Sequence, residues 1–275
     1  MDKEDFSFKR HSIFCSVRTN KMTEKEQFVP AHVLIHVLSG RLSVVEADSV
    51  NTFKRSDTFF VRRNMLAKFT KYPDEGGKPF KALSIFIKKS ILQNYLIREN
   101  NKPSPADHTA TLCRVKKLPP SPLLHNLFDS LGLYFDSGMT LDRELSDIKT
   151  REAILLLKQM DLSLYHSLFH FTEQGKIDLE DFMSKNFMFN VSLETFAKMT
   201  GRSLSTFKRD FEKILNAPPS RWLKQKRLEH AHYLIKEKHK TPSAVYLEVG
   251  FENLSHFSSS FKETYGYNPS TLFGP

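Results

Sequence analysis

The chain has 275 residues, of which 40% are hydrophobic, and it carries a formal net charge of +10. This length and composition predict two domains with sizeable cores, and the basic balance favours a polyanionic partner without choosing between nucleic acid and membrane. The two cysteines, Cys15 and Cys113, belong to no CxxC or Cys/His cluster, which argues against a disulfide scaffold and a zinc finger.

The amino terminus and the apolar runs bear on where the protein resides. The first residues, MDKEDFSFKRHS, lack the apolar core of a secretory signal. The sequence contains no run of about 18 apolar residues, the length that a helix needs to cross a bilayer. Two cysteines far apart in the sequence also suit a reducing compartment. We expect a cytoplasmic protein that has no membrane partner.

Short β patterns at close spacing dominate the first 115 residues. The alternation of Phe6 and Phe8 and the apolar patch from Ile13 to Val17 predict one or two edge strands. The run AHVLIHVLSGRLSVVEA begins at Ala31, is divided by Ser39-Gly40, and predicts a hairpin. Further elements are expected as strands at Thr58 to Val61, Leu66 to Phe69, Ala82 to Ile87 and Thr109 to Val115, a helix at Lys89 to Ile97 and a loop at Arg98 to His108. Such spacing predicts a small barrel or sandwich over residues 1–115.

Two histidines in this region, His32 and His36, are candidates for metal chemistry. On a strand they share one face, so a metal could bridge them only if neighbouring strands supplied further ligands. No HxH pair or nearby carboxylate completes a ligand set. Ordinary structural histidines are the preferred interpretation, and a cupin-type metal-binding sensor or enzyme that uses His32 and His36 is the alternative. A pocket for one small ligand inside a closed sheet is compatible with either interpretation.

Residues 116–175 change to a helical pattern. One apolar stripe consists of Leu123, Leu124, Leu127, Phe128 and Leu131. A second helix is expected from about Leu141 to Met160, with an apolar side of Leu141, Leu145, Ile148, Ile154, Leu155 and Leu157. These helices form a linker that either packs within the chain or joins two copies in a homodimer, and both alternatives stay open.

The last hundred residues, 176–275, predict helices with short turns. The helices are expected at Asp178 to Asn186, from Ser192 to about Gly201, at Ser203 to Leu215, at Ser220 to Lys236, from Pro242, and over a final segment that ends at Gly266. Pro242 suits the first position of its helix. The helix from Ser220 is expected to bury Trp222, Leu223, Leu228, Ala231 and Leu234.

A repeat with an offset of fifty residues organises this region. Leu204, Ser205, Phe207 and Phe211 return as Leu254, Ser255, Phe257 and Phe261, and Pro219-Ser220 returns as Pro269-Ser270 without a gap. The apolar spacing i, i+3, i+7, i+11 predicts an amphipathic helix in each copy. Ser203 and Asn253 suit the N-caps, and Asn216 and Gly266 suit the left-handed position past each helix end. A helix, a Gly-containing turn and a helix, present twice, predict two helix-turn-helix units.

The connecting helix sets the distance between the two units. About 17 residues at 1.5 Å per residue span about 25 Å, and successive major grooves on one face of B-DNA lie about 34 Å apart. Two recognition helices held in this way could enter adjacent grooves of one duplex with some bending. The expected site is therefore about two helical turns long.

Residues 176–275 resemble the DNA-binding domain of the AraC/XylS family of transcription regulators. The resemblance is carried by Ala197, Gly201, Ser203, Phe207, Phe211, Pro219, Arg227, Leu228, Ala231, Gly250, Phe251, Ser255, Phe257, Phe261, Lys262, Gly266 and Pro269. The family commonly ends with Pro, two residues and Tyr-Arg, whereas Leu272-Phe273 stand here, outside the expected recognition helices. Residues 1–115 resemble more loosely the cupin-like sensory barrel of the family's activators, through SDTFFVRRN at Ser56 to Asn64. The resemblance implies an α+β protein with an N-terminal cupin-like β-barrel, a helical linker and a C-terminal all-α domain.

The residues expected to contact DNA lie opposite the apolar stripes. They are Ser205, Thr206, Lys208 and Arg209 in the first unit and Asn253, Ser255, His256, Ser258, Ser259 and Lys262 in the second. Arg209 could pair bidentately with guanine, whereas Lys208 could equally contact phosphate. The second set contains no Arg, so we expect the first unit to specify the sequence and the second mainly to position the protein on the backbone. The basic excess is spread along the chain, so charge adds little to this inference.

These patterns favour a sequence-specific transcription regulator, and an activator in particular. No nucleophile, base and orienting group come together in the sequence, so we expect neither an enzyme nor a cofactor. A constitutive architectural DNA binder is a further alternative. Double-stranded DNA is the expected partner, RNA polymerase is a candidate, and the effector is an unspecified small molecule or partner protein.

Overall fold

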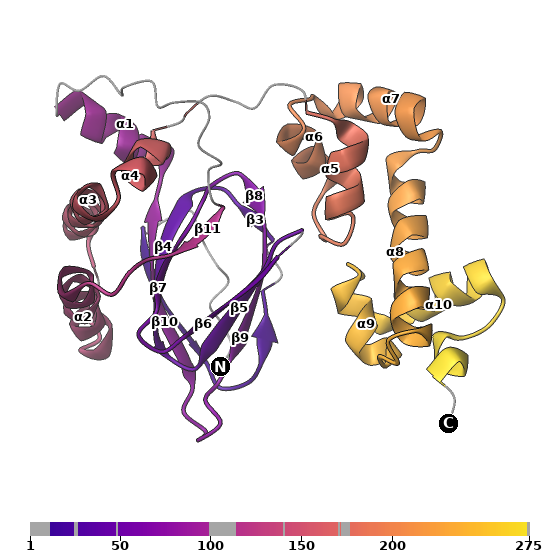
Figure 1. Cartoon of the computed structure of the whole chain (residues 1–275), viewed down its shortest axis with the longest axis horizontal. Helices are drawn as coiled ribbons and strands as arrows, with labels where there is room; N and C mark the ends of the chain where they lie inside the picture. Colours follow the sequence, from indigo (N-terminus) through magenta and orange to yellow (C-terminus); the bar gives the residue numbers. More distant parts are fainter. Residues whose placement is uncertain are drawn as a thin grey trace. The chain divides into compact units, whose positions relative to one another are not determined.

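The computed structural model describes residues 12–24, 27–47, 49–98, 114–139, 141–169, 171 and 177–273. They form two compact lobes (Figure 1). The N-terminal lobe takes nearly all described residues up to 171, and the C-terminal lobe takes those from 177 onward. The expected alternation at Phe6 and Phe8, the loop after Arg98 and most of the strand from Thr109 lie outside the described residues.

Three sheets build the N-terminal lobe. The five-stranded antiparallel sheet has the order β1 (Ile13–Arg18), β10 (Phe80–Ile87), β4 (His32–Ser39), β7 (Thr58–Val61) and β11 (Val115–Lys117). The four-stranded sheet has the order β2 (Met22–Thr23), β9 (Lys68–Tyr72), β5 (Arg41–Val45) and β6 (Val50–Lys54). The pair β3 (Phe28–Val29) and β8 (Met65–Leu66) forms a small third sheet. The β-rich first region expected from the sequence is therefore present.

The five-stranded sheet is buried on both faces. Alternate residues of β4, Val33, Ile35 and Val37, join Leu42, Val44 and Phe53 of the other large sheet in one core. The intervening Leu34 faces a second core with Phe60 and Leu83, and this core is closed by helices. The helices are α1 (Lys89–Arg98), α2 (Pro122–Asp136), α3 (Arg143–Met160) and α4 (Leu162–Leu168), which lie along one side of the sheet in Figure 1. Burial on both faces explains why the sequence of β4, HVLIHVLS, is nearly continuously apolar and does not alternate.

The expected hairpin from Ala31 is wrong, because its two strands belong to different sheets. β4 pairs with β10 and β7, and β5 pairs with β6 and β9. Gly40, between them, has φ +76°, and a Cβ there would lie 2.4 Å from the carbonyl oxygen of Tyr72. Only glycine fits this corner, where the chain leaves one sheet for the other.

Several details of the N-terminal lobe differ from expectation. The strand β6 and the helix α4 were not predicted, and helix α2 keeps Leu123 54% exposed although it was placed in the apolar stripe. Ile148 and Leu155 of α3 are also exposed. These two leucines and one isoleucine widen the apparent stripe beyond the face that the sheet covers. Among the described residues no helix is both long and apolar enough to cross a membrane.

The C-terminal lobe is helical, as predicted. Its helices are α5 (Leu179–Asn186), α6 (Leu193–Met199), α7 (Leu204–Leu215), α8 (Pro219–Lys236), α9 (Pro242–Glu248) and α10 (Leu254–Tyr265), followed by the short 3₁₀ helix η1 (Pro269–Phe273). α8 joins two groups, with α5 to α7 at one end and α9, α10 and η1 at the other (Figure 1). Its 18 residues span about 27 Å at 1.5 Å per residue.

Local signals place the ends of the two repeated helices. Ser203 caps α7 by accepting from the Thr206 amide, and Asn253 caps α10 by accepting from the His256 amide. Asn216 and Gly266 have φ of 54° and 83° at the opposite ends. Each helix is thereby fixed at both ends by residues adjacent to it in sequence, as the repeat predicts.

Candidate nucleic-acid interface

Helix α7 presents a polar face opposite two buried phenylalanines. Phe207 and Phe211 are 0% exposed and lie against each other with ring centroids 5.4 Å apart. Lys208 and Arg209 are exposed, and the Arg209 side chain is 76% accessible. Because a helix turns 100° per residue, fixing the two phenylalanines in the core directs these cations to solvent. Both cations are thus accessible from solvent.

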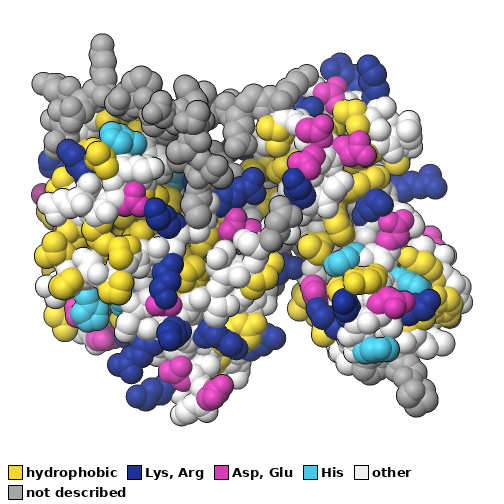
Figure 2. All heavy atoms as spheres, viewed as in Figure 1, with side chains coloured by type: hydrophobic (Ala, Val, Ile, Leu, Met, Phe, Trp, Pro, Cys, Tyr) yellow, Lys and Arg dark blue, Asp and Glu magenta, His cyan; other side chains and the backbone are white. Residues whose placement is uncertain are grey.

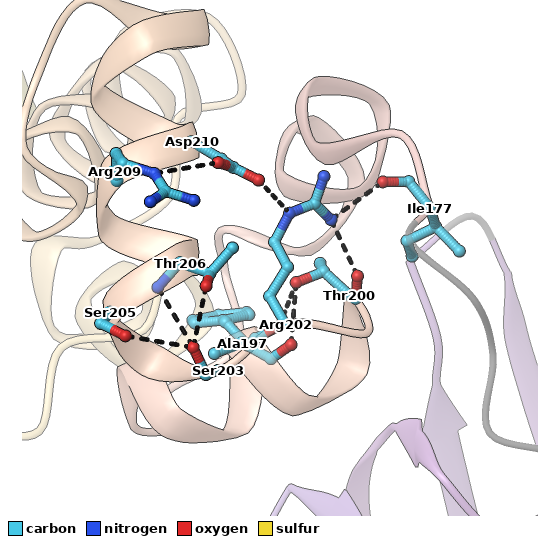
Figure 3. A network of polar contacts seen from close by, with 10 residues as sticks. Ile177, Ala197, Thr200, Arg202, Ser203, Ser205, Thr206, Arg209 and Asp210 are labelled. Atoms are coloured by element: carbon cyan, nitrogen blue, oxygen red, sulfur yellow. Dashed lines mark hydrogen bonds and ion pairs between the residues drawn. The ribbon is translucent and has the colours of Figure 1, made fainter.

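The smaller polar residues of α7 lie in its first turn. Ser205 is exposed and Thr206 is half-buried. The Ser203 hydroxyl lies 3.1 Å from the Ser205 hydroxyl and 2.9 Å from that of Thr206 (Figure 3). It also accepts from the Thr206 amide at 3.3 Å. The cap therefore orders both hydroxyls before any ligand is present.

A network centred on Arg202 fixes α7 to the turn that precedes it. The Arg202 side chain is only 7% exposed, and its Nε donates to Oδ2 of Asp210 at 3.1 Å. Its Nη1 donates to the carbonyls of Thr200 at 2.8 Å and Ile177 at 3.1 Å (Figure 3). The other Asp210 oxygen lies 3.8 Å from Nε of Arg209. One carboxylate thus contacts both a buried arginine and an exposed one.

Helix α10 repeats the buried face but not the charge. Phe257 and Phe261 are fully buried, whereas Ser255, His256, Ser259 and Lys262 are exposed. Ser258 is half-buried, and Ser259 donates its hydroxyl to the His256 carbonyl at 3.1 Å. Asn253 uses its Oδ1 as the cap, which leaves its amide nitrogen as the group able to contact a ligand.

Basic side chains do not form a continuous face on the side of the molecule that Figure 2 shows. Over the region of α5 to α7, Lys and Arg alternate with Asp and Glu (Figure 2). Net charge therefore does not mark a DNA-binding surface on this side, in agreement with the even spread of basic residues along the sequence.

Two arginines that support the recognition helices were not among the expected contact residues. Arg202 lies in the turn before α7, and Arg227 lies in α8 with hydrogen bonds to three main-chain carbonyls. Both are held away from solvent, so they position helices rather than face a ligand. Sequence offered only a weak signal for Arg202, since it stands between Gly201 and the cap Ser203.

The histidine pair of the N-terminal lobe does not form a metal site. His32 and His36 share one face of β4, as expected, but four residues along a strand separate them by about 13 Å. Both point toward the helical layer, where His32 stacks on Phe60 and His36 stacks on Phe128. Within the described part of the chain, no three His, Cys, Asp or Glu residues gather in a way that could hold a metal ion.

Each histidine instead serves the packing. The Arg63 amide donates to Nδ1 of His32 at 3.2 Å, and Nδ1 of His36 lies 2.8 Å from the Thr58 hydroxyl. Burial, aided by the charges of Arg63 and Arg62, lowers the pKa of His32 to about 3. Burial also lowers the pKa of His36. Both rings are neutral at pH 7 and act as core side chains with one polar contact.

Comparisons with known proteins match both lobes. Residues 196–274 match the model of a helix-turn-helix domain, and residues 32–164 match that of the ExsA N-terminal regulatory domain. The HTH-type transcriptional regulator ExsA of Pseudomonas aeruginosa is 24% identical over 249 residues, which cover 85% of this chain and 83% of that protein. The virulence regulon transcriptional activator VirF of Yersinia enterocolitica is 27% identical over 128 residues, or 46% of this chain and 47% of VirF. The chain therefore spans about half the length of that relative.

Among solved structures, a probable AraC family transcriptional regulator from Rhodopseudomonas palustris is similar to part of the chain. The two are 29% identical, the match covers 34% of this chain and 90% of the other, and the TM-score is 0.31.

Proposed function

This chain belongs to the AraC/XylS family of helix-turn-helix transcription regulators, and from that premise we propose that it activates transcription by binding a specific DNA sequence through its C-terminal lobe. The observation that carries the proposal is the duplicated helix. α7 and α10 bury equivalent phenylalanine pairs and turn polar residues outward. Two such helices on one polypeptide suit an operator of about two helical turns.

The two helices have different roles in this proposal. Arg209 reads a guanine through its paired donors, and Lys208 contacts phosphate. Ser205 and Thr206 add hydroxyl contacts near the start of α7. On α10, Asn253, Ser255, His256, Ser258, Ser259 and Lys262 mainly position the protein on the backbone, because none offers the planar fork of an arginine.

We propose that the N-terminal lobe is the regulatory part. Its two large sheets enclose one apolar core, and we infer that they close into the cupin-like barrel suggested by the sequence. The helices of residues 116–175 then serve either to complete this lobe or to join two copies. A small molecule or a partner protein acts on this lobe, and the bound complex recruits RNA polymerase.

Recovery of bound DNA from the source genome tests the proposal. Purified full-length protein is mixed with sheared genomic fragments, and the retained fragments are sequenced. The expected result is a shared sequence motif upstream of genes whose transcription falls when the protein is removed. Retention of fragments that share no motif would contradict sequence-specific binding.

A second experiment distinguishes a regulator from a constitutive architectural binder. Deletion of residues 1–170 removes the proposed regulatory lobe and leaves in place the apolar core that α8, α9 and α10 share. A regulator loses its response to conditions, whereas an architectural protein keeps the same transcript levels. The matched comparison is the intact chain expressed at the same level.

A further inference from the structure

A single arginine of the connecting helix joins three segments of the C-terminal lobe. The Arg227 guanidinium donates from Nε to the Phe187 carbonyl at 2.8 Å and from Nη2 to the Phe189 carbonyl at 2.8 Å. Its Nη1 donates to the Gly250 carbonyl at 3.0 Å. Phe187 and Phe189 follow α5, at the end of the lobe that holds α7, whereas Gly250 lies in the turn before α10. One side chain of α8 is thus hydrogen-bonded both to the segment between α5 and α6 and to the turn before α10.

The turn at Gly250 is pressed against the same segment. Gly250 has φ +94°, and a Cβ there would lie 2.7 Å from the Met188 carbonyl oxygen and 3.0 Å from Nε of Arg227. Since real Cβ atoms do not approach other atoms so closely, only glycine allows this contact. The contact therefore depends on the absence of a side chain as much as on the arginine.

A further hydrogen bond crosses between the same parts. Nδ2 of Asn190, which precedes α6, donates to Oε1 of Glu252, which precedes α10, at 3.0 Å. This bond is exposed, unlike those of Arg227. The two ends of the lobe are therefore tied together beside α8 as well as through it.

The chemistry of the junction requires a guanidinium. Burial lowers the pKa of Arg227 to about 10, so the group remains charged at neutral pH. A guanidinium holds its donors in a rigid planar fork and can satisfy three separate carbonyls at once. A lysine ammonium, on a flexible stem and with its donors at one point, cannot span the same three acceptors.

We infer that Arg227 and Gly250 fix the rotation of one recognition helix relative to the other, so that the protein accepts only one spacing between the two halves of its operator. This inference rests on the proposed function. One added base pair moves the half-sites about 3.4 Å apart and rotates them by about 35°. A lobe tied beside its connecting helix cannot follow that change, so the DNA would have to bend or twist instead. Arg227 is thereby a positioning residue: it orients the recognition helices and so determines which spacing of the two half-sites the protein accepts.

The test measures binding of the full-length protein to its selected operator and to versions with one base pair inserted or deleted between the half-sites. The wild-type protein is expected to lose at least about tenfold in affinity for either shifted operator, equal to about 1.4 kcal/mol. Arg227→Lys is expected to reduce this ratio to about threefold or less, even if its affinity for every operator falls. An unchanged ratio in a folded Arg227→Lys protein would overturn the inference.

A second variant avoids the buried charge. Glu252→Ala removes the exposed bond to Asn190 and leaves Arg227 in place, so folding is preserved and the ratio is expected to fall less than in Arg227→Lys. Circular dichroism of both variants verifies folding. If wild-type protein selects no operator, the proposed function fails. If it selects an operator but binds all spacings equally, the proposed function stands and the inference is wrong.

Discussion

Asp210 accepts a hydrogen bond from Nε of the buried Arg202 at 3.1 Å, while Arg209, which carries the proposed base contact, lies 3.8 Å from its other oxygen (Figure 3). The stronger contact is structural, since Arg202 is almost inaccessible and also binds two carbonyls. The weaker one leaves Arg209 exposed and able to turn toward DNA. The same carboxylate therefore stabilises the fold and lies beside the proposed reader.

Asp210→Ala tests the structural half of this relationship. We expect the free energy of unfolding of the C-terminal lobe to fall by about 2 kcal/mol, because the Arg202 guanidinium loses its charged partner. Trp222, the single tryptophan of the chain, packs on Phe211 with ring centroids 5.6 Å apart. Its fluorescence therefore reports unfolding of this lobe in urea. Glu212→Ala, an exposed acid on the same helix, is the control and should change stability by less than about 0.5 kcal/mol. Equal urea midpoints for the two variants would refute the structural role.

Gly250→Ala and Gly266→Ala separate backbone strain from steric conflict. Both glycines have positive φ, so alanine costs about 1 kcal/mol at either position. Only at Gly250 would the new methyl group meet other atoms, since nothing lies within 4 Å of a Cβ at Gly266. We expect the first variant to lower the urea midpoint clearly more than the second. Similar losses would show that the Met188 contact yields without cost.

Lys208→Ala tests the proposed phosphate contact. We expect weaker binding to all DNA sequences alike and a decrease of about 1 in the slope of log affinity against log salt. Affinity is measured by fluorescence anisotropy at several salt concentrations. Lys78→Ala, an exposed lysine of the N-terminal lobe, should leave the slope unchanged. A loss confined to one operator sequence would instead assign Lys208 to base recognition.

Acid pH should destabilise the N-terminal lobe through His32. Its pKa is about 3 when folded against 6.5 for an ordinary histidine, so below pH 6.5 the unfolded chain binds the additional proton. The stabilising contribution is therefore complete above about pH 6.5 and is lost progressively toward pH 3. His32→Asn keeps an acceptor for the Arg63 amide and removes the titration. The stability of this variant should fall less between pH 7 and pH 5 than that of the wild-type chain. Hydrogen exchange of β4 peptides measures this stability.

The control for this pH experiment is His239→Asn, which makes the same substitution at an exposed position. Residue 239 belongs to the C-terminal lobe, so hydrogen exchange of the β4 peptides in this variant should match that of the wild-type chain at every pH. If His32→Asn also matched the wild type, protonation of His32 would not be a source of acid sensitivity.

The sequence predicted the C-terminal lobe closely because its signals are local. Ser203, Asn253, Asn216 and Gly266 mark the helix ends within a few residues of the bonds they make, and the repeat confirms each assignment with a second copy. The same periodicity places most of the expected DNA contacts on exposed faces, whereas Thr206 and Ser258 are half-buried. Their roles on DNA stay predictions.

Long-range pairing explains what the sequence could not provide. The chain turns at Gly40 into a different sheet, a choice set by β9 and β10 rather than by the residues of the turn. Arg202 and Arg227 bind main-chain carbonyls, and the identity of the residues that offer those carbonyls does not reveal the bonds. Exposed Leu123 and Leu155 resemble core residues in sequence, because the apolar pattern does not state which face a sheet will cover.

Base reading by Arg209 is tested by selecting binding sites from a random duplex library with the wild-type protein and with Arg209→Ala. We predict that the wild type yields one motif of two half-sites spanning about two helical turns. In Arg209→Ala, preference for one base pair in one half-site should fall by about 1–3 kcal/mol while the other half-site is retained. An identical motif from both proteins would contradict base reading by Arg209, and no motif from the wild type would contradict sequence-specific binding itself.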